Sequence, residues 1–179
     1  MGTPVTPARK LIYVEGAQFR SATSEELIQR LAATNNFISL YQYDVYDFKA
    51  NGLYNVNLLN ETGFDGIYVF PFDMEIFFVA MYNTTPGSSG TTSIDIKRTT
   101  GSGTTFSTIF TTAPAITTAA DHTDVAYIYT GGSGTGLTAP VLSSTPFNVS
   151  AGQAIRADFI SKQAGLPENC GILVYFRPR

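Results

Sequence analysis

The sequence predicts an all-β fold, an antiparallel β-sandwich of jelly-roll type with one short N-terminal helix. Three observations lead to this prediction: about nine or ten segments have the residue pattern of strands, one segment has helical periodicity, and strands and helices do not alternate along the chain. We therefore divide the chain into an N-terminal attachment segment with the helix, residues 1–53, and a sandwich domain, residues 54–179.

The helix prediction depends on a capping box at the start of an amphipathic segment. Thr23 and Glu26 have the spacing of an N-cap and a third helical residue, so each side chain can bond the other's free backbone N–H. Leu27, Ile28 and Leu31 follow at the spacing of one helix face. Because a helix of about three turns takes most of its stability from tertiary packing, we expect this apolar stripe to dock on another surface.

The strand predictions begin at residue 41. Period-two alternation or strand-forming composition marks residues 41–46, 53–58, 66–72, 74–82, 93–98, 105–110, 125–129, 146–149, 154–160 and 171–176. Between residues 84 and 145 more than half of the residues are Thr, Ser or Gly, which is a composition also found in linkers. The clean alternation of residues 93–98 indicates short strands joined by polar loops instead.

The segment 74–82 is apolar on both faces of the expected strand. Phe77 and Val79 alternate with Ile76, Phe78 and Ala80. An antiparallel strand normally turns one face to water, so this segment requires either a covered outer face or a neighbouring subunit. Charged residues, which ordinarily protect sheet edges from pairing, are also few, and both features favour an oligomer.

The composition excludes several classes of partner. Only 14% of the residues are charged and the net charge is −3, so no basic patch is available for nucleic acid. The N-terminus lacks an apolar signal segment, and no apolar run approaches the roughly 18 residues of a membrane-spanning helix. We expect a soluble protein made in a cytoplasm, without a nucleic-acid or membrane partner.

The residues that could carry catalysis each have a simpler structural interpretation. His122, the single histidine, could act as a base or a metal ligand, but its position between Asp121 and Thr123 is typical of a polar loop. Cys170, the single cysteine, cannot form an intrachain disulfide. It begins an apolar strand, so we interpret it as a buried hydrophobic residue and not as a nucleophile paired with His122.

Carboxylates are numerous enough that the sequence alone selects no catalytic or metal-binding pair. Candidates for glycoside hydrolysis are Asp44, Asp47, Asp65, Asp73, Glu75 and Asp158, whose distances along the chain do not determine their separation in space. The glycine-rich residues 131–136 lack the Gly-Lys-Ser/Thr ending of a phosphate loop, and Asp73 and Glu75 lack the dense acidic spacing of a calcium loop. We therefore predict no enzyme activity, no cofactor and no metal.

Two regions share their hydrophobic pattern and turn residues with a known class of proteins. The first includes Tyr13-Val14-Glu15-Gly16, Phe19-Arg20-Ser21 and Asn35-Asn36-Phe37-Ile38. The second extends from residue 67 to 176 and includes Ile76-Phe77-Phe78-Val79-Ala80-Met81-Tyr82, Ser93-Ile94-Asp95-Ile96, Phe106-Ser107-Thr108-Ile109-Phe110 and Phe147-Asn148-Val149-Ser150-Ala151-Gly152-Gln153. These regions resemble the attachment segment and the jelly-roll domain of structural modules of tailed-bacteriophage virions, namely capsid decoration proteins and the heads of trimeric fibres.

The resemblance implies a homotrimer, an N-terminal segment that docks on the capsid or tail, and an exposed sandwich. We therefore expect a non-enzymatic capsid decoration, or cement, protein that is located in the virion and binds the major capsid protein or another virion protein. The predicted docking or trimer surface consists of Leu27, Ile28, Leu31, Phe37, Tyr41 and Tyr43. The alternative for these residues is that they only seal the domain's own core.

A second function remains open from the sequence. On this alternative the chain is a tail- or fibre-associated host-recognition module that binds carbohydrate. The polar loops at residues 84–92, 99–105 and 130–138 would then present hydroxyl groups and Tyr rings to glycans, because flexible loops on a rigid sandwich are a common place for binding.

Overall fold

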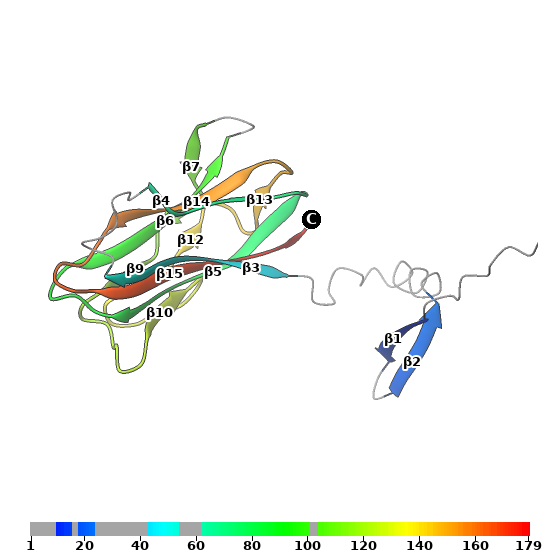
Figure 1. Cartoon of the computed structure of the whole chain (residues 1–179), viewed down its shortest axis with the longest axis horizontal. Coiled ribbons are helices and arrows are strands. Elements are labelled where there is room, and N and C mark those ends of the chain that lie inside the picture. Colours follow the sequence, from blue (N-terminus) through cyan, green and yellow to red (C-terminus); the bar gives the residue numbers. More distant parts are fainter. Residues whose placement is uncertain (1–9, 16–17, 24–42, 54–61, 101–103) are drawn as a thin grey trace, which may run out of the picture. The chain divides into compact units, whose positions relative to one another are not determined.

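The structure is a computed structural model, and it describes residues 10–15, 18–23, 43–53, 62–100 and 104–179 (Figure 1). The ordered elements of these ranges are strands, and every pair of neighbouring strands within them is antiparallel. The predicted all-β, antiparallel class is confirmed. The chain separates into two compact units, Met1–Gln42 and Tyr43–Arg179.

The first unit contains a two-stranded sheet. Strand β1 (Lys10–Glu15) pairs with β2 (Gln18–Thr23), so that Lys10 lies opposite Thr23. Thr23, the predicted helix N-cap, is the last residue of β2. The predicted helix and five of the predicted docking residues lie outside the described residues: Leu27, Ile28, Leu31, Phe37 and Tyr41.

The second unit contains two larger sheets, which we call the β5 sheet and the β6 sheet. The β5 sheet has the order β10-β5-β15-β3, with β13 also on β5. Its strands are β3 (Asp44–Leu53), β5 (Met74–Thr85), β10 (Ala126–Tyr129), β13 (Phe147–Val149) and β15 (Glu168–Pro178).

The β6 sheet has the order β11-β9-β6-β14-β4, with β7 also on β6. Its strands are β4 (Thr62–Val69), β6 (Thr91–Thr99), β7 (Phe106–Thr108), β9 (Ala115–Thr117), β11 (Leu137–Thr138) and β14 (Ala154–Ser161). A short separate pair is formed by β8 (Phe110–Thr112) and β12 (Val141–Leu142).

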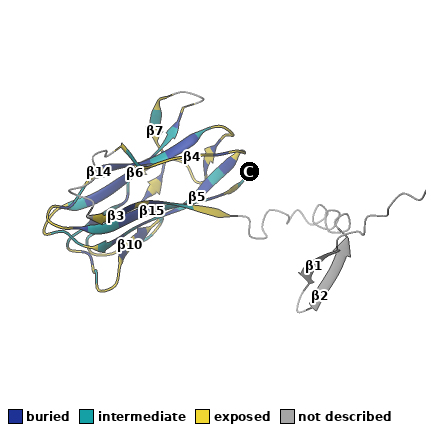
Figure 2. Ribbon diagram, in the orientation of Figure 1, coloured by how far each residue is buried: buried dark blue, intermediate teal, exposed yellow. Residues whose placement is uncertain are grey.

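The two sheets enclose one hydrophobic core. Phe48, Ile76 and Ile172 of the β5 sheet and Ile94 and Ile155 of the β6 sheet are fully buried members of the same cluster. Each lies on a strand whose alternate residues face the other way, as the period of two requires. Figure 2 shows the buried residues along the inner strands of this unit. The architecture is therefore sandwich-like.

The predicted boundary between the two parts of the chain differs from the structure. Residues 44–53, placed in the attachment segment, form β3, which pairs with β15 along its length. The physical reason is that this segment contributes Phe48 and Ala50 to the sandwich core, and their burial stabilises its pairing with β15. Of the strand predicted at residues 53–58, only Leu53 is described, and it ends β3.

Strand β5 shows how a segment that is apolar on both faces fits the sandwich. Its inner face, including Ile76, Val79 and Met81, is buried, whereas Phe77 and Phe78 on the outer face are half-buried. Phe77 is the extra residue of a bulge, because β15 pairs Phe176 with Ile76 and Tyr175 with Phe78. The outer cover within the described residues consists of aromatic rings from neighbouring strands.

Candidate functional site

The outer side of the β5 sheet carries a continuous group of aromatic rings. We call it the aromatic face and define it by Tyr43, Phe77, Phe78, Tyr127, Tyr129 and Tyr175. The group exists because strand alternation turns Tyr175 outward between the buried Val174 and Phe176, and the register places it opposite Val45 of β3 and Phe78 of β5.

Ring contacts connect the aromatic face from one edge of the sheet to the other. The ring centroids of Tyr43 and Tyr175 are 6.0 Å apart, those of Tyr175 and Phe78 are 5.3 Å apart, and those of Phe78 and Tyr129 are 5.7 Å apart. Tyr127 continues the row at 6.2 Å from Tyr129. Such pairs each contribute about 0.5–1.5 kcal/mol beyond the burial of area, so the face is ordered before any partner binds.

The aromatic face nevertheless remains open to water. The exposed fractions of Tyr43, Tyr127 and Tyr129 are 55%, 57% and 41%, and neighbouring Val45 is 41% exposed. Contiguous apolar patches on a soluble domain mark sites of interaction more often than single exposed residues do.

Charged groups of both signs border the aromatic face. Glu75 forms an ion pair with Arg177, whose guanidinium carbon lies 5.2 Å from the centroid of the Phe77 ring. On the neighbouring part of the sheet, Lys49 Nζ lies 3.2 Å from Asp47 Oδ2. The border is therefore nearly neutral, because each ion pair contains one cationic and one anionic side chain.

Tyr82 is held close to the main chain at the Lys49 side of the face. Its hydroxyl donates to Asp47 at 3.3 Å, and burial, followed by the nearby carboxylate, raises the pKa of this phenol. The ring lies over Gly171, where an added Cβ would lie 2.5 Å from Tyr82 Cζ. Glycine at this position is thus required by the close approach of the ring.

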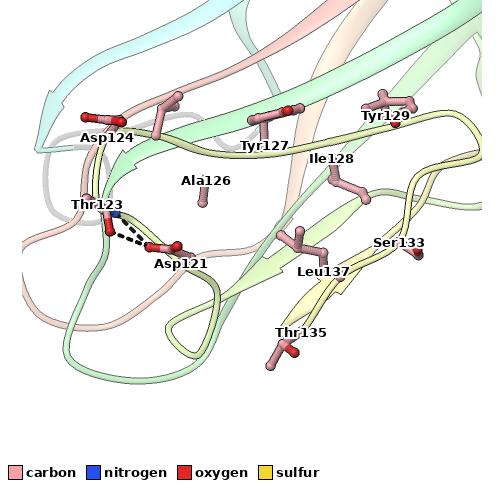
Figure 3. Close-up of a pocket in the computed structure, with 12 residues that line it drawn as sticks. Asp121, Thr123, Asp124, Ala126, Tyr127, Ile128, Tyr129, Ser133, Thr135 and Leu137 are labelled. Carbon is pink, nitrogen blue, oxygen red and sulfur yellow. Dashed lines mark hydrogen bonds between the residues drawn. The ribbon is translucent and has the colours of Figure 1, made fainter.

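A cavity of about 510 Å³ lies beside β10 at the edge of the same sheet (Figure 3). It is lined by Asp121, Thr123, Asp124, Val125, Ala126, Tyr127, Ile128, Tyr129, Ser133, Gly134, Thr135 and Leu137. Ser133, Gly134 and Thr135 of the glycine-rich segment 131–136 therefore line one wall of the cavity. They lie in a loop without the following helix that a phosphate loop has.

The structure places Tyr43 alone of the predicted docking residues. It is exposed and belongs to the aromatic face, so it does not seal the core of the second unit. The sequence analysis did not use the fact that alternate residues of three further strands face outward. This alternation could have identified Phe77, Tyr127 and Tyr175 as surface aromatics, but it could not have shown that their rings contact one another across the sheet.

His122 and Cys170 do not form a catalytic pair among the described residues. The Nδ1 atom of His122 hydrogen-bonds the carbonyl oxygen of Ala120 at 2.7 Å. Cys170 is 1% exposed and lies in the core, where burial raises the pKa of its thiol and the negative charge of Asp47 raises it further. A thiol held in its neutral form is a poor nucleophile.

The candidate carboxylates are mostly engaged in separate interactions. Asp73 Oδ2 lies 3.5 Å from Arg179 Nη2, and Asp65 accepts a hydrogen bond from the backbone N–H of Lys49 at 2.9 Å. Asp44 accepts from the N–H of Val45 at 2.8 Å. Within the ranges that the structure describes, no group of three or more His, Cys, Asp or Glu side chains is placed to hold a metal ion.

One carboxylate pair was missed by the sequence reasoning. Asp95 and Asp158 lie opposite each other on β6 and β14, and with Lys97 and Arg156 they define what we call the charged face, on the outer side of the β6 sheet. Lys97 Nζ is 3.0 Å from Asp158 Oδ2, and Arg156 Nη2 donates to Asp158 Oδ2 at 3.1 Å. The alternation of residues 93–98 predicts that Asp95 and Lys97 share one face of a strand, but it does not predict which strand lies beside them.

The charged face is neutralised and covered from within the chain. Thr108 of β7 donates to Asp95 at 2.6 Å, and the Phe106 ring lies 4.2 Å from the guanidinium carbon of Arg156. Burial raises the pKa of the Asp95 carboxyl, while the hydrogen bond from Thr108 and the charge of Lys97 oppose this shift. The arrangement is that of a structural ion network.

Comparison with known proteins adds no relative: no protein-family model matches the chain, and no curated protein sequence matches it. In the part of the chain that the structure describes, no helix has the length and apolar character needed to cross a membrane.

Proposed function

We propose that the chain is a non-enzymatic structural protein of the capsid decoration type, located in the virion, whose sandwich self-associates through the aromatic face. The observation that carries this proposal is the row of six contacting aromatic side chains on the outer side of the β5 sheet, of which three are more than 40% exposed. Burying such a face against a partner supplies apolar area at about 25 cal/mol per Å² before the costs of association.

The strand order supports a jelly roll, which is the domain that the resemblance to phage virion proteins implies. The eight strands of the two sheet paths are β10-β5-β15-β3 and β9-β6-β14-β4, apart from the short β11. Chain neighbours such as β3 and β4, β5 and β6, and β14 and β15 thus lie in opposite sheets. This is the arrangement of eight strands in two sheets that characterises jelly rolls.

The partner that fits the aromatic face best is a second copy of the chain. The ion pairs Glu75–Arg177 and Asp47–Lys49 give the border both signs of charge, so a neighbouring copy in a ring can meet it without a net repulsion. A ring of three copies agrees with the homotrimer expected from the resemblance. Attachment to the major capsid protein or another virion protein is assigned to the N-terminal unit.

The mass of the full chain in solution tests self-association. We expect a trimer at micromolar concentration by sedimentation velocity. We also expect the double substitution Tyr43→Glu and Val45→Glu to weaken the trimer by at least about tenfold, because unpaired carboxylates are then buried in an apolar interface. Both side chains are exposed, so the fold of each copy is retained.

The matched control changes two exposed apolar residues of the other sheet. Ile67 and Val69 of β4 are 56% and 51% exposed, and Ile67→Glu with Val69→Glu should leave the trimer intact. A monomeric wild-type chain, or equal dissociation of both double variants, would contradict the proposal.

The attachment role of the N-terminal unit needs a separate experiment. Truncation of residues 1–36 removes three of the predicted docking residues and should abolish incorporation into the particle while the remainder keeps its oligomeric state. Undiminished incorporation of the truncated chain into particles, measured by quantitative gel analysis, would refute this assignment.

A further inference from the structure

The cavity beside β10 follows the free edge of that strand. β10 is the outermost strand of the β5 sheet, and all the residues from Thr123 to Tyr129 line the cavity. Because successive side chains of a strand point to opposite faces, a cavity that borders consecutive residues lies along the backbone edge. Its volume of about 510 Å³ falls within the range of small-molecule sites, which is roughly 300–1,000 Å³.

The backbone of β10 offers a donor and an acceptor to this cavity. Thr130 N–H donates to the carbonyl of Val79 on β5 at 3.0 Å. Since hydrogen-bonded pairs alternate along an antiparallel ladder, Ile128 also faces β5, whereas Tyr127 and Tyr129 turn their backbone groups away from it. The Tyr129 carbonyl accepts from Gly132 N–H at 2.8 Å, but the N–H and C=O of Tyr127 have no partner among the described residues.

The side chains that line the cavity add hydroxyl and carboxylate groups from two walls. Thr123 stands on the wall that leads into β10, and Ser133 and Thr135 stand on the opposite wall. Asp121 accepts hydrogen bonds from the Thr123 hydroxyl at 2.7 Å and from the Thr123 N–H at 2.9 Å, which fixes the carboxylate and lowers its pKa (Figure 3). Hydroxyl groups can donate and accept, whereas ionised carboxylates only accept.

Two tyrosine rings flank the cavity on one side of β10. Figure 3 shows Tyr127 and Tyr129 side by side on one side of the strand and Ala126 and Ile128 on the other. The planes of the two rings differ by only 19°, and both rings are well exposed. Near-parallel exposed rings offer a flat apolar surface of the size of the C–H face of a pyranose ring, while their phenol groups stay in water.

The charge of the lining narrows the class of ligand. It contains the carboxylates of Asp121 and Asp124 and includes no Lys, Arg or His. Such a lining repels phosphate, sulfate and acidic sugars. A simple amine would use the carboxylates but leave the hydroxyl groups and the backbone groups of Tyr127 unpaired, whereas a ligand with several hydroxyl groups can pair with all of them.

We propose that the cavity beside β10 binds a neutral saccharide, whose hydroxyl groups pair with Asp121, Thr123 and the backbone of Tyr127 and whose ring packs on the tyrosines. The cavity shares Tyr127 and Tyr129 with the aromatic face, whereas Asp121 and Thr123 lie outside that face, so Asp121→Asn tests the saccharide site apart from self-association. It assigns a binding role to residues 133–135 and to Asp121, which self-association through the aromatic face does not use.

The test is binding of the full chain to an array that carries neutral, acidic and amino glycans, followed by calorimetric titration of the best neutral glycan. We expect neutral glycans alone to bind. Tyr127→Ser and Asp121→Asn should each weaken binding by at least about tenfold. The control Ile67→Ser removes an exposed apolar side chain outside the cavity lining and should leave the affinity unchanged.

Three results would overturn the proposal. They are the absence of binding to every neutral glycan, preferential binding of acidic or amino glycans, and binding to neutral glycans that both cavity variants retain in full. Circular dichroism of each variant establishes that a loss of binding does not come from a loss of fold. Self-association is measured in parallel, so a failure of saccharide binding and a failure of self-association are separate outcomes.

Discussion

The two outer faces of the sandwich differ in their side chains, which are ionic on one face and aromatic on the other, and in how far these side chains are paired within the chain. On the charged face, Asp158 is 4% exposed and has both Lys97 and Arg156 as partners, so the charges are paired within the chain. On the aromatic face the rings contact one another, yet Tyr43 and Tyr127 remain more than half exposed. The charged face therefore completes its own interactions, whereas the aromatic face leaves apolar area exposed to water.

The largest effect on stability is expected from removal of the carboxylate at the centre of the charged face. Asp158→Ala leaves Lys97 and Arg156 without their carboxylate and removes the acceptor of the Gly63 N–H, which is 2.7 Å from Asp158 Oδ1. We expect the free energy of unfolding to fall by about 2–3 kcal/mol, because two part-buried cations lose the carboxylate that they share and the Gly63 N–H loses its acceptor. Urea denaturation followed by circular dichroism measures the loss.

The matched control for this prediction is Asp124→Ala. Asp124 is an exposed carboxylate, and no hydrogen bond or ion pair of its side chain is recorded within the described ranges. Its removal should change the free energy of unfolding by less than about 0.5 kcal/mol. If the two variants lose equal stability, the charged face contributes no more than an ordinary surface.

A second prediction concerns the close packing beside the aromatic face. Gly171→Ala puts a Cβ into the space of the Tyr82 ring, so the ring must move and its hydroxyl loses Asp47. We expect a loss of about 1–2 kcal/mol in the free energy of unfolding, which is the usual cost of overpacking. Thermal and urea denaturation provide the measurement.

A double-mutant cycle separates the steric effect from any other effect of the alanine. In a chain that already carries Tyr82→Ala, the Gly171→Ala substitution should cost much less, because the ring that it would displace is absent. If the two substitutions lower the free energy of unfolding additively, the cost of Gly171→Ala does not come from displacement of the Tyr82 ring.

The sequence predicted the local part of the fold and not its long-range part. Alternation is a local property, so residues 93–98 and 171–176 were correctly assigned to strands, which the structure extends to β6 and β15. Which strands pair is not local. The pairing of Asp95 with Asp158, and the contact of Tyr43 with Phe77 and Tyr175, depend on registers between distant segments.

The candidate sites show the same division between local and long-range information. Composition indicated a polar, weakly charged surface with exposed tyrosines in loops, and the loop at residues 130–138 does line a cavity. The sequence could not reveal that β10 forms the edge of its sheet, because this depends on the absence of a neighbouring strand on one side. The helix and the docking stripe after Thr23 stay predictions, since they lie outside the described residues.

The smallest expected effect is a difference in pH dependence, and it concerns Asp95 of the charged face. Burial raises the pKa of this carboxyl above its ordinary value of 3.8, so the folded chain holds the proton more tightly than the unfolded chain does. As the pH rises from that value through the folded pKa, ionisation of Asp95 therefore lowers the free energy of unfolding. Asp95→Asn removes this contribution and keeps an oxygen acceptor for Thr108.

Unfolding of the wild type and of Asp95→Asn at a series of acidic to neutral pH values isolates this contribution, because the other carboxylates are common to both chains. We expect the stability of the variant relative to the wild type to increase as the pH rises above 3.8. A constant or decreasing difference would contradict the assignment. Because Asp95 lies on the charged face, its variant should also leave the oligomeric state unchanged, so acid dependence and self-association are expected to separate between the two faces of the sandwich.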